Sequence, residues 1–201
     1  MKRPAAALLR APPAIVSGVA VALSVAPMRS LIEQSMVWHM VVQMPLLVFG
    51  GWLAMRAALR TAAWPWLDEC NRYGLTGLIA VQAVVAYWML PLAIDRAVVL
   101  PQFDLLKVAT LWAGGALLRH SAERAPVVLQ LFFVGTTVSM LVWLGTFFAS
   151  TELRLCNAYS LQTQVLAGQG TVGLGVTIGA IWLLRTLTRA AGPRRGKDGR
   201  P

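Results

Sequence analysis

Long apolar runs, most of them long enough to cross a bilayer, limit what this chain can fold into. The runs lie at residues 12–28, 35–55, 74–94, 103–118, 126–150 and 165–187. A helix needs about 20 predominantly apolar residues to span the hydrocarbon core of a membrane. Only 13% of the 201 residues are charged, whereas a soluble domain carries about 25%. We therefore expect an all-α, polytopic transmembrane helix bundle of about six spans, with lipid as the solvent for much of its surface.

The basic residues favour one orientation of these spans. If the N-terminus lies inside and the spans alternate, 14 of the 18 Lys and Arg residues fall in inside segments. The other four are Arg29, Arg96, Lys107 and Arg154. Lys and Arg concentrate on the cytoplasmic side of membrane proteins, so we expect both termini in the cytoplasm and the chain in a bacterial plasma membrane. This placement explains the net charge of +10 without nucleic acid, since no nucleic-acid-binding motif accompanies the charge.

The two ends of the chain carry signals of their own. The first run follows a basic start and precedes a small-residue site at Ser24–Ala26, as in a signal peptide. Pro27 would follow the cleaved bond, so we favour an uncleaved first span, and cleavage would leave five spans. Residues 189–201 combine Gly and Pro with basic residues. This composition predicts a disordered cytoplasmic tail after a helical bundle of residues 1–188.

The second run carries the side chains best suited to a site. At about 100° per residue, Met36, His39, Met40, Gln43 and Met44 fall on one helix face. Thioether and imidazole groups suit Cu(I), and an ionisable residue within a span is a candidate functional residue. The sequence thus predicts a Cu(I) site in the outer half of the bilayer, with the three methionines and the histidine as ligands. A packed face without any ligand explains the same spacing, because Met fills irregular gaps in cores.

A fifth candidate ligand is Cys156, in the third outside loop. Alternation of the spans brings this loop to the outer end of the second span. The alternative is a small residue buried at a helix end. The other cysteine, Cys70, is predicted inside, so we expect no disulfide between the two.

Charged residues near the outer ends are expected to form structural ion pairs. Asp95, Arg96 and Asp104 lie in or beside the second outside loop, where they can pair with one another or with Glu33 and Arg154. Lys107 is expected to extend to the lipid headgroups, because a lysine near the end of a span can place its ammonium there.

Small residues recur every four positions in the last run, at Ala167, Thr171, Gly175 and Gly179. Such a stripe lets another helix approach closely. The partner helix can belong to the same bundle or to another subunit.

Several catalytic chemistries find no support in the sequence. It contains no phosphate-binding glycine loop, no His-Glu-x-x-His motif and no convincing nucleophile–base pair. The two histidines, His39 and His120, are predicted on opposite sides of the membrane, which disfavours a bis-histidine haem, and no partner for His120 is evident. We therefore do not expect an enzyme.

The second span resembles a known family. The stretch His39–Gly50, with its His-Met start, its proline and its apolar run ending in glycine, is similar to the helix of CtaG-type cytochrome c oxidase assembly factors. The resemblance implies a polytopic plasma-membrane protein that helps supply copper to haem–copper oxidases. It carries over His39 and Met40 as ligands, and Gln43 stands where the family has a second histidine.

The expected function is therefore a non-enzymatic assembly factor that holds or passes Cu(I), or accompanies an oxidase subunit. Its expected partners are the lipid bilayer and other membrane protein subunits. The alternative is a structural accessory subunit of a respiratory or other membrane complex. A small-solute transporter is a third class, but the inner halves of the predicted spans offer little of the polar path that it needs.

Overall fold

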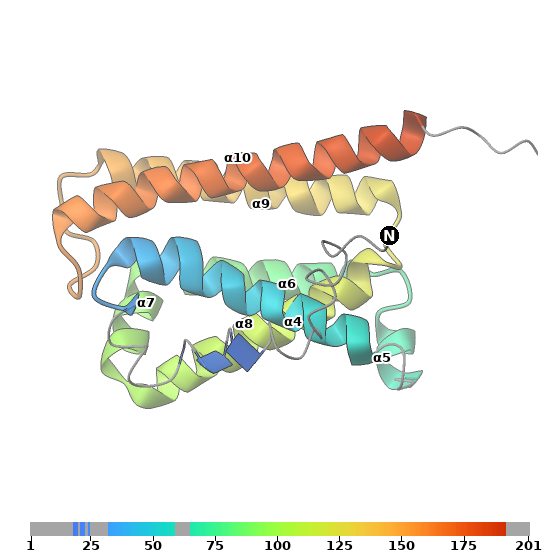
Figure 1. Cartoon of the computed structure of the whole chain (residues 1–201), viewed down its shortest axis with the longest axis horizontal. Coiled ribbons are helices and arrows are strands. Elements are labelled where there is room, and N and C mark those ends of the chain that lie inside the picture. Colours follow the sequence, from blue (N-terminus) through green and yellow to red (C-terminus); the bar gives the residue numbers. More distant parts are fainter. Residues whose placement is uncertain (1–17, 20, 23, 25–31, 59–64, 192–201) are drawn as a thin grey trace, which may run out of the picture.

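The computed structural model describes residues 18–19, 21–22, 24, 32–58 and 65–191. Within these ranges the chain is helical and has no strand, which confirms the predicted all-α bundle. The elements are η1 (Trp38–Gln43), α4 (Met44–Ala58), α5 (Pro65–Cys70), α6 (Leu75–Trp88), α7 (Pro91–Val99), α8 (Pro101–Ala122), α9 (Val127–Ser150) and α10 (Leu161–Ala191). Figure 1 shows the long α9–α10 hairpin lying along a second group of helices formed by η1, α4, α6 and α8.

Three stretches of the described chain are long and apolar enough to cross a membrane. They are Trp38–Met55, Val127–Ser150 and Leu161–Ala191, and the bent pair α6 and α7 is a fourth candidate. The predicted span at 103–118 forms α8, which carries Asp104 and Lys107 and does not meet this criterion. Most of the first predicted span lies outside the described residues, so the count of six stays a prediction.

The third predicted span, 74–94, is not one straight helix. α6 ends at Trp88 and α7 begins at Pro91, and the two helices are bent by 72°. Leu90 between them is extended, because a following proline disfavours helical backbone in the residue before it. The same arrangement ends α7, where Leu100 is extended before Pro101. The part of the chain predicted as the second outside loop is therefore largely the short helix α7, at one end of the bundle (Figure 1).

In the group formed by η1, α4, α6 and α8, glycines allow a close contact between α4 and α8. A Cβ on Gly51 would collide with the carbonyl oxygen of Trp112, and a Cβ on Gly115 would collide with that of Val48. The two backbones can approach this closely only because both positions lack a side chain. This contact holds α8, which carries Lys107, against α4, which continues directly from η1 and its His39.

The small residues of the last predicted span pack inside the chain, against α9. Ala167, Thr171 and Gly175 are buried. On the same pair of helices, a Cβ on Gly145 would lie 2.6 Å from the carbonyl oxygen of Gly168. Of the two alternatives for this stripe, these residues therefore show packing within the bundle.

The chain ends are only partly described. α10 continues to Ala191, so residues 189–191 belong to the helix and not to the predicted tail. Alanine and arginine are good helix formers, which explains the longer helix. Residues 192–201, and most of the predicted first span with its cleavage site, lie outside the described residues.

Candidate functional site

The second predicted span starts with a π-helical turn, η1, before it continues as α4. The N–H of Met44 donates to the carbonyl oxygen of His39, five residues earlier. Pro45 follows directly and has no N–H to donate to the turn before it. A widened turn next to a proline relieves this conflict, and π-helical turns are frequent at functional sites.

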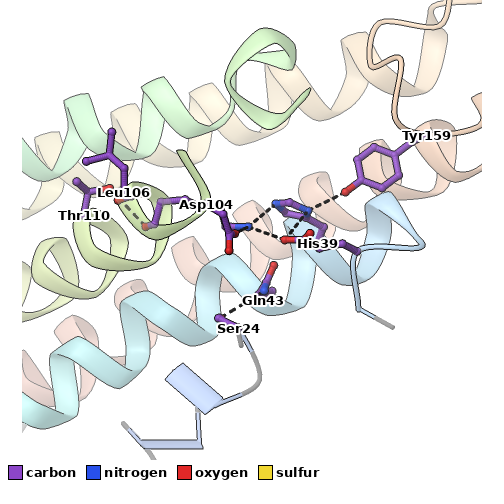
Figure 2. Close-up of polar contacts among 9 residues, drawn as sticks. Ser24, His39, Gln43, Asp104, Leu106, Thr110 and Tyr159 are labelled. Atoms are coloured by element: carbon purple, nitrogen blue, oxygen red, sulfur yellow. Dashed lines mark hydrogen bonds and ion pairs between the residues drawn. The ribbon is translucent and has the colours of Figure 1, made fainter. Parts of the chain in front are cut away.

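The predicted face of this span is buried. Exposed fractions are 0% for Met36 and His39, 1% for Met40, and 2% for Gln43 and Met44. Trp38 and Val42 on the opposite face are 56% and 38% exposed. The Gln43 amide nitrogen donates to Ser24 Oγ at 3.3 Å (Figure 2). The sulfur and imidazole groups therefore point into the protein, as their spacing predicted.

His39 lies in a group of charged and polar side chains drawn from several parts of the chain (Figure 2). Nζ of Lys107 on α8 is 3.2 Å from His39 Nε2, 2.9 Å from Glu33 Oε1 and 2.8 Å from Asp104 Oδ1. The hydroxyl of Tyr159, from the segment between α9 and α10, is 2.7 Å from His39 Nδ1. We call these five residues the ion cluster.

The contacts of the ion cluster define where its protons lie. An ammonium has three N–H donors and no acceptor, and the three contacts of Lys107 are with Glu33, Asp104 and His39 Nε2. Nε2 therefore accepts, which places the imidazole proton on Nδ1, where it is donated to the Tyr159 oxygen. A neutral histidine with this tautomer satisfies the contacts on both ring nitrogens.

The burial of Lys107 overturns a sequence prediction. Its side chain is 0% exposed, and those of Glu33 and Asp104 are 7% and 10% exposed. The ammonium does not extend to the surface of the protein, because the carboxylates of Glu33 and Asp104 compensate its charge inside it. A buried charge is very costly unless it is paired in this way. The spacing of Asp104 and Lys107, three residues apart on one helix, was the available signal for an internal pair.

The short segment 151–160 holds Tyr159 in place at the end of the bundle where α7 lies (Figure 1). Arg154 donates to the carbonyl oxygens of Tyr159 and Asn157, at 3.1 and 2.9 Å. Asp95 on α7 accepts the backbone N–H groups of Asn157 and Ala158, at 3.0 and 3.3 Å. These backbone contacts fix the loop and so aim the phenol at His39.

The predicted charge pairs at this end of the bundle differ from those in the structure. Asp104 pairs with Lys107, one turn along the same helix, and this pair was not among those expected. The Arg96 guanidinium lies 5.7 Å from the centre of the Phe103 ring.

Tyr159 was not predicted as a site residue, because nothing in its local sequence indicates a distant histidine partner.

Cys156, the fifth predicted ligand, is fully buried in the same core as the three methionines. Burial raises the pKa of its thiol from 9.0 to about 12, and the Asp95 carboxylate adds a smaller increase. The thiol is therefore neutral at physiological pH, whereas the thiolate is the form that binds metals.

A second polar cluster lies at the other end of α8. His120 Nε2 is 2.8 Å from Asp68 Oδ1, and its Nδ1 is 3.0 Å from the Asn71 amide nitrogen. Asn71 also donates to Ser121 Oγ at 2.8 Å and accepts the N–H of Gly77 at 2.9 Å. These contacts orient the amide so that Nδ1 of His120 accepts. The sequence indicated no partner for His120, and the structure provides two.

Among the residues that the structure describes, no group of three or more His, Cys, Asp or Glu side chains is arranged to hold a metal ion.

The comparisons with known proteins found no relative of this chain. No protein-family model matches the chain, and no curated protein or solved structure matches it. Kinship with the CtaG-type family therefore stays a prediction, as does copper binding.

Proposed function

We propose that this chain is a non-catalytic assembly factor for a haem–copper oxidase of a bacterial plasma membrane, and that it binds Cu(I) next to the ion cluster. The proposal rests on one observation: all five predicted ligands are buried at one end of the bundle. Met36, Met40, Met44 and Cys156 belong to a single cluster of buried side chains, and His39 lies on the same helix face as the methionines. Soft thioether and thiolate ligands favour Cu(I) over harder ions.

The five ligands fit Cu(I) to different degrees. Thioethers carry no proton and are ready to coordinate, so Met36, Met40 and Met44 would hold the ion. Both ring nitrogens of His39 already have partners in the protein, so His39 can join the set only by giving up Tyr159 or Lys107. Cu(I) and the Lys107 ammonium both carry a charge of +1. The carboxylates of Glu33 and Asp104 can therefore neutralise the charge of either cation.

The experiment is a double substitution, Met36→Leu with Met40→Leu, which removes two thioethers at nearly constant volume, in cells whose oxidase is assayed in isolated membranes. Oxidase activity should fall while the amount of this protein is unchanged. The matched control is Val42→Leu with Phe49→Leu, on the same span, where the side chains are 38% and 52% exposed. Equal oxidase activity in the two double variants would reject the proposal.

A structural accessory subunit of a membrane complex is the second candidate. It is favoured by the way the ion cluster links η1, α8 and the segment before α10 through contacts within the protein alone. Such a cluster has an architectural role without any metal. This candidate is expected to co-purify with a larger complex in mild detergent and to contain no copper.

A further inference from the structure

An apolar groove of about 340 Å³ runs between α6 and α9. On α6 it is lined by Leu75, Ile79 and Ala83, and on α9 by Leu129 and Phe132, together with other side chains. Ile79 and Phe132 are 60% and 69% exposed, so the groove opens on the outer surface of the bundle and not on its core. In a membrane, this surface faces lipid.

The polar side chains in the lining offer nothing to a polar ligand. Gln82 accepts a hydrogen bond from Thr137 at 2.8 Å, and its amide nitrogen contacts the Met140 sulfur at 3.5 Å. Thr136 donates to backbone carbonyl oxygens of its own helix at 2.9 Å. These groups find their partners within the protein, so the groove suits a hydrocarbon chain.

The length of the groove matches one leaflet. On α6 its lining runs from Leu75 to Ala86, a distance of about 16 Å at roughly 1.5 Å per helical residue. The hydrocarbon core of a bilayer is about 30 Å thick. The groove therefore extends over about half of the membrane, from the end of the bundle where α6 begins.

A free cation lies at that end. Arg72 is exposed and comes three residues before Leu75, and its guanidinium stacks on the Tyr73 ring at 5.6 Å from the ring centre. No carboxylate in the described part of the chain forms a salt bridge with it. Guanidinium groups recognise phosphate well, and tyrosines concentrate at the membrane–water interface.

We propose that the groove between α6 and α9 binds one acyl chain of an anionic phospholipid, with the lipid phosphate at Arg72. The apolar lining selects a hydrocarbon chain, and the Arg72 guanidinium at the end where α6 begins selects the charge of the headgroup. The charge distribution predicts that this end of the bundle is cytoplasmic. The lipid therefore belongs to the inner leaflet.

Native mass spectrometry of the full chain in mild detergent, with added phosphatidylglycerol or phosphatidylcholine, tests this. Ala83→Phe fills the groove, and Ala80→Phe places the same side chain on the same helix at an exposed position outside it. Wild type and Ala80→Phe should retain one phosphatidylglycerol that Ala83→Phe loses. Arg72→Gln should lower the preference for phosphatidylglycerol over phosphatidylcholine by about tenfold, as expected for one charge-assisted contact.

Three results would overturn the proposal. One is equal retention of phosphatidylglycerol by the Ala83→Phe and Ala80→Phe proteins, and another is an unchanged lipid preference in Arg72→Gln. The third is a lipid-free dimer that Ala83→Phe dissociates, which would assign the groove to a second copy of the chain. If Ala83→Phe does not fold, Ala86→Leu blocks the far end of the same groove and should show the same loss.

Discussion

The ammonium nitrogen of Lys107 lies 3.2 Å from Nε2 of His39, and both side chains are fully buried. The contact connects α8 to η1, and it defines which ring nitrogen of His39 carries the proton. It also places a cation at the nitrogen that a metal would otherwise use. The ion cluster is therefore both a structural link and the feature that any account of copper binding must explain.

Replacing Lys107 with methionine should strongly destabilise the protein. The substitution removes the ammonium that pairs with the Glu33 and Asp104 carboxylates inside the protein, and removal of one partner of a buried ion pair costs about 3–5 kcal/mol. We expect this decrease in the free energy of unfolding, measured by circular dichroism in detergent. Leu105→Met on the same helix, where the leucine is 70% exposed, should change stability by less than about 0.5 kcal/mol.

A compensated variant separates the charge effect from the loss of packing. Lys107→Met combined with Glu33→Gln and Asp104→Asn removes all three charges together. We expect it to be more stable than Lys107→Met alone, because the two carboxylate charges are removed together with the ammonium. If the single variant is as stable as Leu105→Met, the charge pairing within the ion cluster does not stabilise the fold.

Tyr159→Phe should weaken the link between the segment 151–160 and the helices. It removes the hydroxyl that lies 2.7 Å from His39 Nδ1, and loss of a partner at a buried polar group costs about 1–3 kcal/mol. Thermal unfolding in detergent measures this loss. Tyr73→Phe is the control, since Tyr73 is 67% exposed, and a Tyr159→Phe protein as stable as the control would contradict the assigned contact.

The two cysteines should differ in reactivity. Cys70 is exposed and Cys156 is buried, and the raised pKa of Cys156, about 12, keeps its thiol neutral at pH 8. Iodoacetamide at pH 8 should therefore modify one thiol per folded chain, and the Cys70→Ser variant should stay unmodified. Modification of Cys156 in that folded variant would show that the loop opens.

The same pKa shift predicts how stability depends on pH. The folded state holds the Cys156 proton more tightly than the unfolded chain, whose thiol has the ordinary pKa of 9.0. The contribution of this thiol to stability is thus complete below about pH 9 and is lost as the pH rises towards 12. Cys156→Ser should show a weaker decrease in stability across that interval.

Glycine substitutions test the packing of α4 on α8. Gly51→Ala places a methyl group against the carbonyl oxygen of Trp112, and overpacking of this kind costs about 1–3 kcal/mol. Gly135→Ala on α9 meets no atom within 4 Å and should be neutral or stabilising by up to about 1 kcal/mol, because alanine favours helix. Equal melting temperatures for the two variants would contradict the close helix contact.

Hydrophobicity and periodicity were sufficient to predict the helical bundle and the buried face of its second predicted span. Lipid imposes long apolar helices, and a face that carries His39 and three methionines within three turns can be identified from spacing alone. The sequence also contained a signal for the bend between α6 and α7, because Pro91 lies at that point. The apolar run continues through it, however, so composition alone predicted a single span.

The contacts of the site could not be predicted, because they join residues that are far apart in the sequence. Lys107 was assigned to the headgroup region, since nothing in a single helix shows that Glu33 lies opposite it. Tyr159 reaches His39 only because Arg154 and Asp95 fix the backbone of its loop. These contacts depend on how the helices are arranged, which hydropathy does not encode.

The central claim is that the buried soft ligands beside His39 bind Cu(I). The most direct measurement is the copper content of the detergent-purified protein after anaerobic loading with Cu(I), with Met40→Leu and Val42→Leu proteins treated in parallel. We expect about one copper per chain in the wild type and in Val42→Leu, and a clear loss in Met40→Leu, which lacks one of the thioether ligands. Absence of copper from all three proteins would contradict it, and the accessory-subunit function would then be the better explanation of the ion cluster.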